Sequence, residues 1–503
     1  MKASIDAGNS RFKIAVPDAT GAPKLLTNRA GETFTPSVVY FSEDGSVLVG
    51  TKAENAALAN PKRAVFNWKR HMGTNKVLYT SDDGKSYTAK DILAILLKNA
   101  KEDVEAKTEM VVNEAVITVP ANYTDNQKQQ TIDAAADAGM MVIALPHEPT
   151  AAALGNGLHL KKNCTVLVFD LGGGTFDVSI GRVEGNVCKI IATNGEPHLG
   201  GQDFNNRIIE KVLEKFESEH NFRPDPAKHP VFFQDMANRA EQLKVGLSAQ
   251  RQFQIVLSCD GRLVNMTVTR DQFNSWVNNL VDKCIEKTEQ TLKDANMTWS
   301  EIDELLPVGG GSAMPIVIER LEKASSKKMS RKCEPHCAAA LGGVLAGRIE
   351  YERQGKPYIL GEFTLPPPGV YVHDVLSRPI GVLVLNDKGK EICYEILGKG
   401  LPIPSIQTHV FKLTEPHQTQ VILKVLQGDN GTDASKCVVL GHFELKDLPP
   451  RPDLIGRVEV TYHLDSSGML TATARDIVSG KSTELRIEYK NNGNSGTSQK
   501  KVA

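Results

Sequence analysis

Short apolar runs alternate with long amphipathic stretches from the first residue to about residue 347. The short runs have the length of buried strands, whereas apolar residues that recur every three or four positions indicate helices. Strands and helices that alternate along a chain are typical of an α/β architecture. Helices are predicted over residues 89–106, 125–138, 203–220, 235–247 and 271–295.

The pattern changes after residue 347. The run Pro366-Pro367-Pro368 cannot continue a helix or a central strand, so residues 348–375 are predicted to form a Pro-rich interdomain linker. Residues 376–490 show short alternating strands separated by frequent turn signals, which predicts a β-sandwich. Residues 491–503 are polar and rich in Gly, Ser and Lys, and we expect them to be disordered. The chain is therefore predicted to hold an α/β domain over residues 1–347 and an all-β domain after the linker.

Two glycine turns stand out within the α/β region: Asp6-Ala7-Gly8-Asn9-Ser10 and Asp170-Leu171-Gly172-Gly173-Gly174-Thr175. Each turn lies between two apolar runs and is predicted to join two strands as a hairpin. Glycine lets a phosphate approach backbone N–H groups closely, and a carboxylate at a strand end suits Mg²⁺. The alternative for the first turn is an ordinary glycine hairpin. Three consecutive glycines are harder to explain in that way, since each loses roughly 0.5 to 1 kcal/mol relative to alanine in a regular element.

The composition restricts the function further. A chain of 503 residues is long enough for several domains, and a formal net charge of −1 argues against nucleic acid or an anionic membrane as a partner. Because no run of about 18 apolar residues occurs, no membrane span is predicted. Eight scattered cysteines and a first strand that begins almost at Met1 predict a cytoplasmic protein. The segment from Cys333 to Cys337 lacks a second Cys/His pair and is interpreted as the start of a buried helix rather than a metal site.

Four further motifs follow in a fixed order: VPANY at 119–123, PHEPTAAA at 146–153, TNGEPHLGGQDF at 193–204 and VGGGS at 308–312. Together with the two glycine turns they closely resemble the seventy-kilodalton heat-shock protein (Hsp70) family, the DnaK-type chaperones, over almost the whole chain. The resemblance implies an actin-like ATPase of two lobes, each a sheet flanked by helices, followed by an all-β sandwich that binds substrate. It also implies roles in protein folding and the stress response.

The resemblance implies a role for each matching residue. Asp6 and Asp170 would hold Mg²⁺ through its waters, with K⁺ as a further candidate cation, and ATP or ADP would lie between the lobes. The implied catalytic residues are Lys69, Glu148, Asp170, Thr175 and Asp177. The implied nucleotide-binding residues are Asp6, Gly8, Asn9, Ser10, Gly172, Gly173, Gly174, Gly200, Gly201, Glu241, Lys244, Ser248, Gly309, Gly310, Gly311 and Ser312.

Without the resemblance, plainer interpretations stand beside these roles. Lys69 next to Arg70 would be a solvated surface pair, and Lys244 a solvated helix residue. Glu148 would be a carboxylate that stabilises the start of a helix.

The sandwich also carries matching positions. The residues that match those lining the family's peptide cleft are Val382, Val384, Leu385, Phe411, Val421 and Leu423. Unfolded or extended hydrophobic peptides are the implied substrates. J-domain co-chaperones and nucleotide-exchange factors accompany the family and are candidate partners. The alternative is that these apolar residues form the core of the sandwich.

Four departures from the family pattern are expected to matter. Asn9 replaces a usual threonine, and Ala313 replaces an arginine that stacks on adenine, a contact worth about 0.5 to 2 kcal/mol. Val370-Tyr371-Val372-His373 precedes Asp374-Val375 where the family carries a leucine-rich segment. The sequence also ends after the sandwich, so we expect no helical lid and rapid peptide exchange in every nucleotide state.

The leading functional hypothesis is therefore an ATP-dependent chaperone in which hydrolysis switches the sandwich between open and closed states. A second hypothesis is a nucleotide-gated adaptor for one specific protein partner. A third is an actin-fold small-molecule kinase, because Asp6-x-Gly8-Asn9-Ser10 also resembles the phosphate loop of such kinases.

Overall fold

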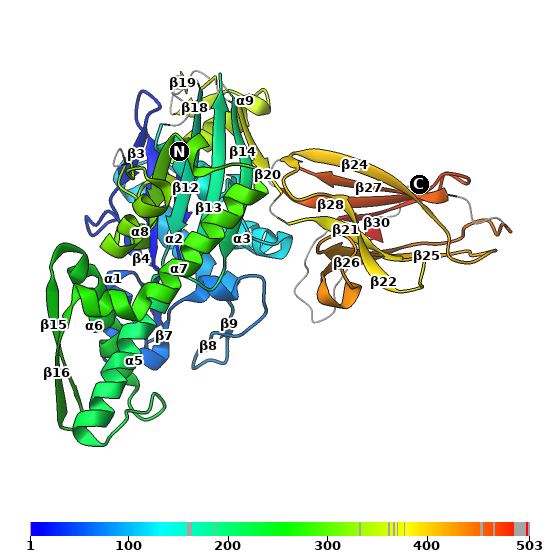
Figure 1. The fold of residues 1–503 in the computed structure, drawn as a ribbon. Helices are drawn as coiled ribbons and strands as arrows, with labels where there is room; N and C mark the ends of the chain where they lie inside the picture. Colours follow the sequence, from blue (N-terminus) through cyan, green and yellow to red (C-terminus); the bar gives the residue numbers. More distant parts are fainter. Residues whose placement is uncertain are drawn as a thin grey trace. The chain divides into compact units, whose positions relative to one another are not determined.

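The structure is a computed structural model of the chain. It describes residues 2–157, 163–185, 187–330, 333–360, 363–365, 368–369, 371–376, 378–452, 456–465, 468–486 and 499–500. By their internal contacts the residues divide into two units, the first formed by Met1–Ala121 with Thr131–Val372 and the second by Asn122–Gln130 with His373–Ala503. Figure 1 shows the mixed α/β content of the first unit and the all-β character of residues after 373.

The first sheet of the first unit has the strand order β11-β10-β1-β2-β3, with β4 beside β2. Its strands are β1 (Lys2–Ala7), β2 (Arg11–Pro17), β3 (Pro23–Leu26), β4 (Thr35–Pro36), β10 (Glu114–Thr118) and β11 (Met141–Ala144). β1 and β2 form the predicted hairpin, whose register pairs Ala7 with Phe12. The glycine turn at Gly8 therefore lies at one end of the sheet.

The second sheet of this unit contains the order β17-β12-β13-β14. Its strands are β12 (Asn163–Leu171), β13 (Phe176–Glu184), β14 (Val187–Glu196) and β17 (Glu304–Val308). β12 is buried over almost its full length, which explains why its sequence is a continuous apolar run rather than an alternating one. The predicted hairpin of β12 and β13 is confirmed, and Leu171 pairs with Phe176 across the three glycines.

The helices are α1 (Thr51–Ala57), α2 (Ala89–Thr108), α3 (Asp125–Asp137), α4 (Glu148–Gly155), α5 (Gly201–His220), α6 (Pro230–Ala249), α7 (Arg270–Asp294), α8 (Pro315–Ser325) and α9 (Ala338–Arg353). α4, α7 and α9 pack against these two sheets, whereas α5 and α6 pack against each other (Figure 1). The five predicted helices are confirmed as α2, α3, α5, α6 and α7. The largest difference is at α6, which begins five residues earlier than predicted because Pro230 occupies its first turn, where proline is favoured.

Helices α4 and α9 cross at backbone distance. A Cβ on Gly155 would lie 2.1 Å from the carbonyl oxygen of Ala338, and one on Gly342 would lie 1.6 Å from that of Ala151. No side chain larger than hydrogen fits at either position. Since α4 begins at Glu148, this crossing supports the helix that carries a predicted catalytic residue.

Smaller elements complete the first unit. They are β5 (Val39–Phe41), β6 (Val47–Val49), β7 (Ala64–Val65), β8 (Tyr79–Thr80), β9 (Ser86–Tyr87), β15 (Gln252–Cys259), β16 (Arg262–Thr269), β18 (Tyr358–Leu360), β19 (Phe363–Leu365), and the short 3₁₀ helices η1 (Pro61–Arg63), η2 (Trp68–His71), η4 (Trp299–Glu301) and η5 (Gly310–Ala313). The end of α9 and strands β18 and β19 fall within residues 348–375, for which the sequence predicts a linker.

The second unit contains two antiparallel sheets, with orders β22-β21-β25-β26 and β24-β27-β28-β29-β30. The strands are β21 (Ile380–Leu385), β22 (Glu391–Leu397), β24 (Ser405–Lys412), β25 (Val421–Gln427), β26 (Val438–Leu445), β27 (Gly456–Leu464), β28 (Leu470–Asp476), β29 (Ser482–Arg486) and β30 (Gln499–Lys500); β20 (Tyr371–Val375) pairs with β23 (Pro402–Ile403), and η6 (Ala434–Lys436) precedes β26. Apolar residues of both sheets share one core. Apart from Gln499 and Lys500, the predicted disordered tail lies outside the described residues.

Two polar interactions lie inside this sandwich. The Tyr462 hydroxyl donates to the Gly381 carbonyl, 2.9 Å away, and so joins the two sheets across the core. Arg457 and Asp476 form a fully buried ion pair, with N–O distances of 2.6 and 3.1 Å. Burial opposes ionisation of Asp476, but Arg457 and Ser479 hold the pKa of this carboxyl far below its usual range.

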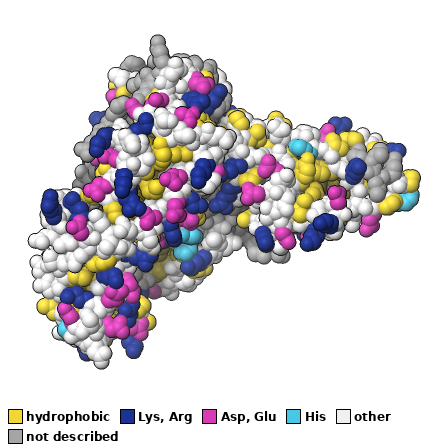
Figure 2. Space-filling view, in the orientation of Figure 1, with side chains coloured by type: hydrophobic (Ala, Val, Ile, Leu, Met, Phe, Trp, Pro, Cys, Tyr) yellow, Lys and Arg dark blue, Asp and Glu magenta, His cyan; other side chains and the backbone are white. Residues whose placement is uncertain are grey.

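Side chains of both charges are interspersed over the face seen in Figure 2, as the near-zero net charge predicts. No helix among the described residues is long and apolar enough to cross a membrane.

Candidate functional site

Four acidic side chains from separate elements gather inside the first unit. Asp6 lies near the end of β1, Asp170 near the end of β12, Asp177 opposite it in β13, and Glu148 begins α4. All four are buried. Because each comes from the end of an element that the chain reaches at a different point, the fold rather than local sequence brings them together.

Two lysines accompany these carboxylates. The Lys69 ammonium donates to Glu148 Oε1 and to the Ala7 carbonyl, both at 2.7 Å, and the residue is only 7% exposed. Lys69 is therefore not a solvated surface residue. The Lys13 ammonium lies 2.9 Å from Asp6 Oδ2, since the β1–β2 register places Lys13 opposite Asp6.

The crowding of carboxylates changes their titration. Burial, followed by the charges of Glu148, Asp177 and Asp6, raises the pKa of Asp170 well above its ordinary value, and Lys13 opposes this only in part. Burial and the charge of Glu148 raise the pKa of Asp177 to about 8, against the opposing effect of Lys69.

The same crowding indicates a place for a cation. Among the described residues no group lies at hydrogen-bonding distance and angle from either Asp177 carboxylate oxygen, and the Thr175 side chain offsets the raised pKa of this carboxyl only in part. Four carboxylates against two ammonium groups leave a formal charge of −4 + 2 = −2 if all are ionised, which a divalent ion would balance. Oxygen ligands of this kind suit Mg²⁺, so the residues present fit that ion.

The two glycine turns face each other beside this cluster. A Cβ on Gly173 would lie 2.1 Å from the Ser10 hydroxyl, and one on Gly174 would lie 3.0 Å from the Asn9 amide nitrogen. A Cβ on Gly200 would lie 2.5 Å from the Gly174 carbonyl carbon. Gly200 therefore has to be glycine because an added Cβ would meet backbone, whereas at Gly173 and Gly174 the Ser10 and Asn9 side chains would have to move. Glycine-rich turns of this kind suit a site where backbone groups bind a small anion.

Arg70 also belongs to this region, although it is not among the predicted site residues. Its Nη2 donates to the Gly174 carbonyl at 2.9 Å and to Asp203 Oδ2 at 2.6 Å. Asp203 in turn accepts from the Gly200 amide at 2.8 Å, at the start of α5. Arg70 thus holds the second glycine turn against the first turn of that helix.

The predicted nucleoside contacts lie on α6. The Lys244 ammonium donates to Glu241 Oε2 at 2.7 Å and to the Gly201 carbonyl at 3.2 Å. Burial alone would raise the pKa of Glu241, but Lys244 and Asn205 outweigh that effect and lower it. The Ser248 hydroxyl donates to the Lys244 carbonyl at 3.3 Å. Lys244 is buried, so it is not a solvated helix residue.

The turn from Gly309 to Ser312 packs against the end of β12. Gly309 has φ +74°, and a Cβ there would lie 2.7 Å from Asp170 Oδ1. The Ser312 hydroxyl donates to the Gly309 carbonyl at 2.7 Å, so its proton is used within the turn. Gly310 is open, since an added Cβ meets nothing within 4 Å.

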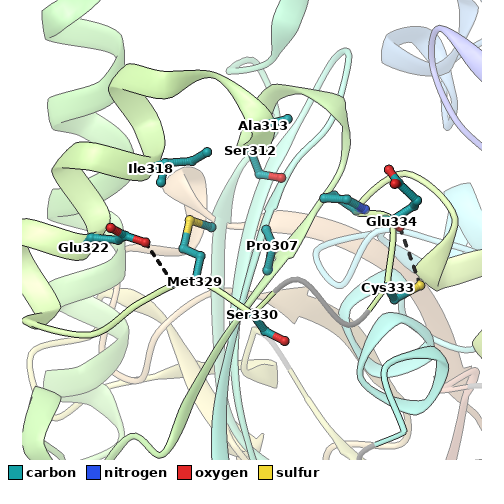
Figure 3. Close-up of a pocket in the computed structure, with 10 residues that line it drawn as sticks. Pro307, Ser312, Ala313, Ile318, Glu322, Met329, Ser330, Cys333 and Glu334 are labelled. Carbon is teal, nitrogen blue, oxygen red and sulfur yellow. Dashed lines mark hydrogen bonds between the residues drawn. The ribbon is translucent and has the colours of Figure 1, made fainter. Parts of the chain in front are cut away.

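A cavity of about 230 Å³ opens on the other side of this turn (Figure 3). It is lined by Pro307, Ser312, Ala313, Ile318, Glu322, Met329, Ser330, Cys333, Glu334 and Pro335. Ala313 is exposed there. None of the four clustered carboxylates and neither Lys69 nor Lys244 lines the cavity, so the carboxylates and glycine turns, rather than this cavity, mark the candidate reaction centre.

The side chain of Asn9, one of the departures from the family pattern, already forms a hydrogen bond within the protein. Its amide nitrogen donates to Asn67 Oδ1 at 2.9 Å. Its own amide oxygen is buried and has no hydrogen-bond partner among the residues that the structure describes. The donor of Asn9 is thus directed at Asn67.

The six candidate peptide contacts lie in three different environments. Val382 and Leu423 are buried in the sandwich core. Val384, Phe411 and Val421 are half-buried and pack against that core. Leu385 is 49% exposed.

Comparison with known families agrees with this geometry. The family model described as Hsp70 protein matches residues 3–503, which is essentially the whole chain. Members of that family are ATP-dependent chaperones. The chain therefore belongs to the Hsp70 family.

Proposed function

We propose that this chain hydrolyses ATP between the two lobes of an actin-like domain and uses that reaction to control peptide binding by its β-sandwich. The observation that carries the proposal is the buried cluster of Asp6, Glu148, Asp170 and Asp177 beside two glycine turns that exclude side chains. Such an arrangement gathers a phosphate chain with its metal ion and is of no evident use to a purely structural domain.

The chain's own residues supply positioning and charge. Backbone N–H groups of the turn at Gly8 and of Gly173, Gly174 and Thr175 would bind the phosphate oxygens, whereas the Gly172 amide donates to the Thr175 carbonyl. Mg²⁺, held through its waters by Asp6 and Asp170, would neutralise phosphate charge. The Lys69 ammonium is fixed by Glu148 and the Ala7 carbonyl and would offset charge on the γ-phosphoryl group.

The acidic residues of the cluster would take part in proton transfer. Before any cation binds, Asp177 has a pKa of about 8 and keeps its proton near neutral pH. Mg²⁺ bound beside it would favour the ionised carboxylate, which would then be able to accept a proton. Glu148 hydrogen-bonds Lys69 and so would orient the attacking water relative to that ammonium. Thr175 closes the second glycine turn, where its carbonyl accepts from the Gly172 amide at 3.0 Å.

We propose Val384, Leu385, Phe411 and Val421 as the accessible part of a groove for extended hydrophobic peptides. Burying one leucine yields roughly 1.5 to 3 kcal/mol, whereas a micromolar complex needs about 8 kcal/mol. Backbone hydrogen bonds must therefore contribute to binding. Val382 and Leu423 support the groove from the core in the conformation described. This burial also favours the second candidate, a nucleotide-gated adaptor for a specific partner, because fewer apolar side chains are free to grip an unfolded chain.

J-domain co-chaperones and nucleotide-exchange factors are the proposed partners. The eight cysteines are all free thiols, which supports a reducing cytoplasm as the proposed location.

Phosphate release from Mg²⁺-ATP, measured with and without an extended hydrophobic peptide, tests the proposal. Stimulation by peptide supports the chaperone. Slow turnover that is indifferent to peptide supports the adaptor, and hydrolysis only after a small metabolite is added supports a kinase. Loss of turnover in Lys69→Met would show that the activity belongs to this site rather than to a contaminant.

A further inference from the structure

A second candidate site lies at the turn of the β15–β16 hairpin and shares no residue with the carboxylate cluster. We propose that His229, Cys259 and Asp260 form a Zn²⁺ site at the turn of the β15–β16 hairpin. The possible ligand atoms of these three residues all lie within 4.8 Å of one another. Figure 1 shows the hairpin beside α5 and α6.

The hairpin fixes two of the ligands. β15 alternates exposed and buried residues, and Cys259 is its last inward-facing position. The register pairs Cys259 with Arg262, so that Asp260 and Gly261 form a two-residue turn with φ values of +49° and +74°. The tight turn holds the thiol and the adjacent carboxylate on one end of the hairpin.

The third ligand comes from the start of α6, where His229 precedes Pro230. Its Nε2 lies 3.0 Å from Asp260 Oδ2. Its Nδ1 accepts from the Asp225 amide at 3.1 Å and also lies 3.0 Å from the Asp225 carbonyl, and the ring meets Phe222 edge to face with centroids 5.7 Å apart. In one tautomer Nδ1 accepts from that amide and Nε2–H donates to Asp260; in the other Nδ1–H donates to the carbonyl and Nε2 carries the lone pair. Metal binding requires the second tautomer, which is the usual arrangement of a metal-bound histidine.

The donor set selects the metal. A thiolate, an imidazole and a carboxylate suit Zn²⁺, whereas Mg²⁺ and Ca²⁺ prefer oxygen ligands. Tetrahedral Zn²⁺ with bonds of about 2.0 to 2.3 Å places its ligand atoms about 3.4 to 3.6 Å apart. The existing separations need changes of about 1.2 Å or less, which side-chain rotation can supply. On binding, the Cys259 thiol releases its proton to solvent, and a water molecule would fill the fourth position.

The surrounding charges are compatible with a cation. One thiolate and one carboxylate balance the two charges of Zn²⁺. Arg262 is the nearest cationic side chain in the hairpin, and its guanidinium lies over the Phe222 ring, 4.3 Å from the centroid, with Nη1 donating to the Asp260 carbonyl at 3.3 Å. It thus contacts the backbone of Asp260 rather than the proposed ligand atoms.

The simpler account of these residues is a His229–Asp260 hydrogen bond next to a cysteine that serves as a small core residue. The two accounts predict different absorption spectra when Co²⁺ is added. Bound to a thiolate, Co²⁺ gives an intense near-ultraviolet charge-transfer band, which binding to the carboxylate cluster does not give because that cluster contains no sulfur.

The experiment titrates the full chain with Co²⁺ alone and then displaces it with Zn²⁺. We expect one thiolate-bound Co²⁺ per chain, a band lost in Cys259→Ser, and binding at least tenfold weaker in Asp260→Asn. Cys284→Ala is the matched control, since this buried thiol of α7 belongs to no such group, and its titration should equal that of the unaltered protein. Absence of the band in the unaltered protein, or its persistence in Cys259→Ser, would overturn the proposal. If Cys259→Ser does not fold, an unchanged affinity in Asp260→Asn would overturn it equally.

Discussion

Replacing Asp177 by asparagine should stabilise the empty protein while weakening its binding of Mg²⁺-nucleotide. Asp177 is 1% exposed, and burial together with the charge of Glu148 raises its pKa from 3.8 to about 8, against the smaller opposing effects of Lys69 and Thr175. Near neutral pH the folded protein therefore keeps a proton on this carboxyl that the unfolded chain releases. Asparagine of the same shape carries no such penalty.

The size of the effect follows from linkage. Between pH 5 and pH 7 the folded state binds one more proton than the unfolded state at this residue, so the free energy of unfolding falls as the pH rises. The slope is at most about 1.4 kcal/mol per pH unit, which gives up to about 2.7 kcal/mol over this window.

Urea unfolding of nucleotide-free, EDTA-treated protein at pH 5, 6 and 7 measures this slope. Trp68, Trp276 and Trp299 all lie in the first unit, so tryptophan fluorescence reports its unfolding. The free energy of unfolding of Asp177→Asn, relative to that of the unaltered protein, should increase as the pH rises. The constant cost of burying an amide cancels in the comparison between pH values.

A matched control is Glu184→Gln at the exposed far end of the same strand. Its difference in unfolding free energy from the unaltered protein should change little with pH. The reasoning is wrong if the stability difference between Asp177→Asn and the unaltered protein is the same at pH 5 and pH 7. A stability difference that shrinks as the pH rises from 5 to 7 would be equally decisive. With Mg²⁺-ATP present, the variant should gain less stability from the ligand than the unaltered protein does.

Four further outcomes are expected. Lys69→Met should slow phosphate release about 10²- to 10³-fold in single-turnover assays, and an unchanged rate would remove Lys69 from the mechanism. Gly200→Ala places a Cβ 2.5 Å from the Gly174 carbonyl carbon and should weaken nucleotide binding at least tenfold in a fluorescence titration. Ala313→Arg should tighten nucleotide binding up to about thirtyfold by calorimetry, if an arginine there stacks on adenine. Arg457→Met leaves Asp476 buried without its partner and should cost the sandwich about 3 to 5 kcal/mol, seen as faster hydrogen exchange in β27 and β28; equal exchange would contradict it.

The elements of the first unit were largely predictable because their signals are local. The apolar runs on either side of Gly8 and Gly172 lie next to their turns, and each hairpin closes over a few residues. The helix ends differ by a few residues, since caps and prolines shift them without changing the apolar face. The hairpin of β15 and β16 carries a clear alternating pattern that predicts strands.

The site was predictable in part. Asp6 and Lys13 could have been paired from the sequence, because the short turn at Gly8 fixes the strand register. Arg70 could not, since its partners Gly174 and Asp203 lie 104 and 133 residues away and no local pattern marks them. Similarly, no local sequence pattern near His229 indicates that its ring contacts Asp260, which lies in a hairpin turn 31 residues later.

The crossing of α4 and α9 has a mechanical consequence. Helices that interlock through large side chains must change rotamers to slide, whereas Gly155 and Gly342 present only backbone to their neighbours. Close packing of this kind resists separation of the two helices. Because no side chains interdigitate at the two glycines, the helices can still slide past each other by a small distance. Since Glu148 begins α4, such sliding would move the carboxylate that fixes Lys69. A larger side chain at Gly155 or Gly342 would block the movement.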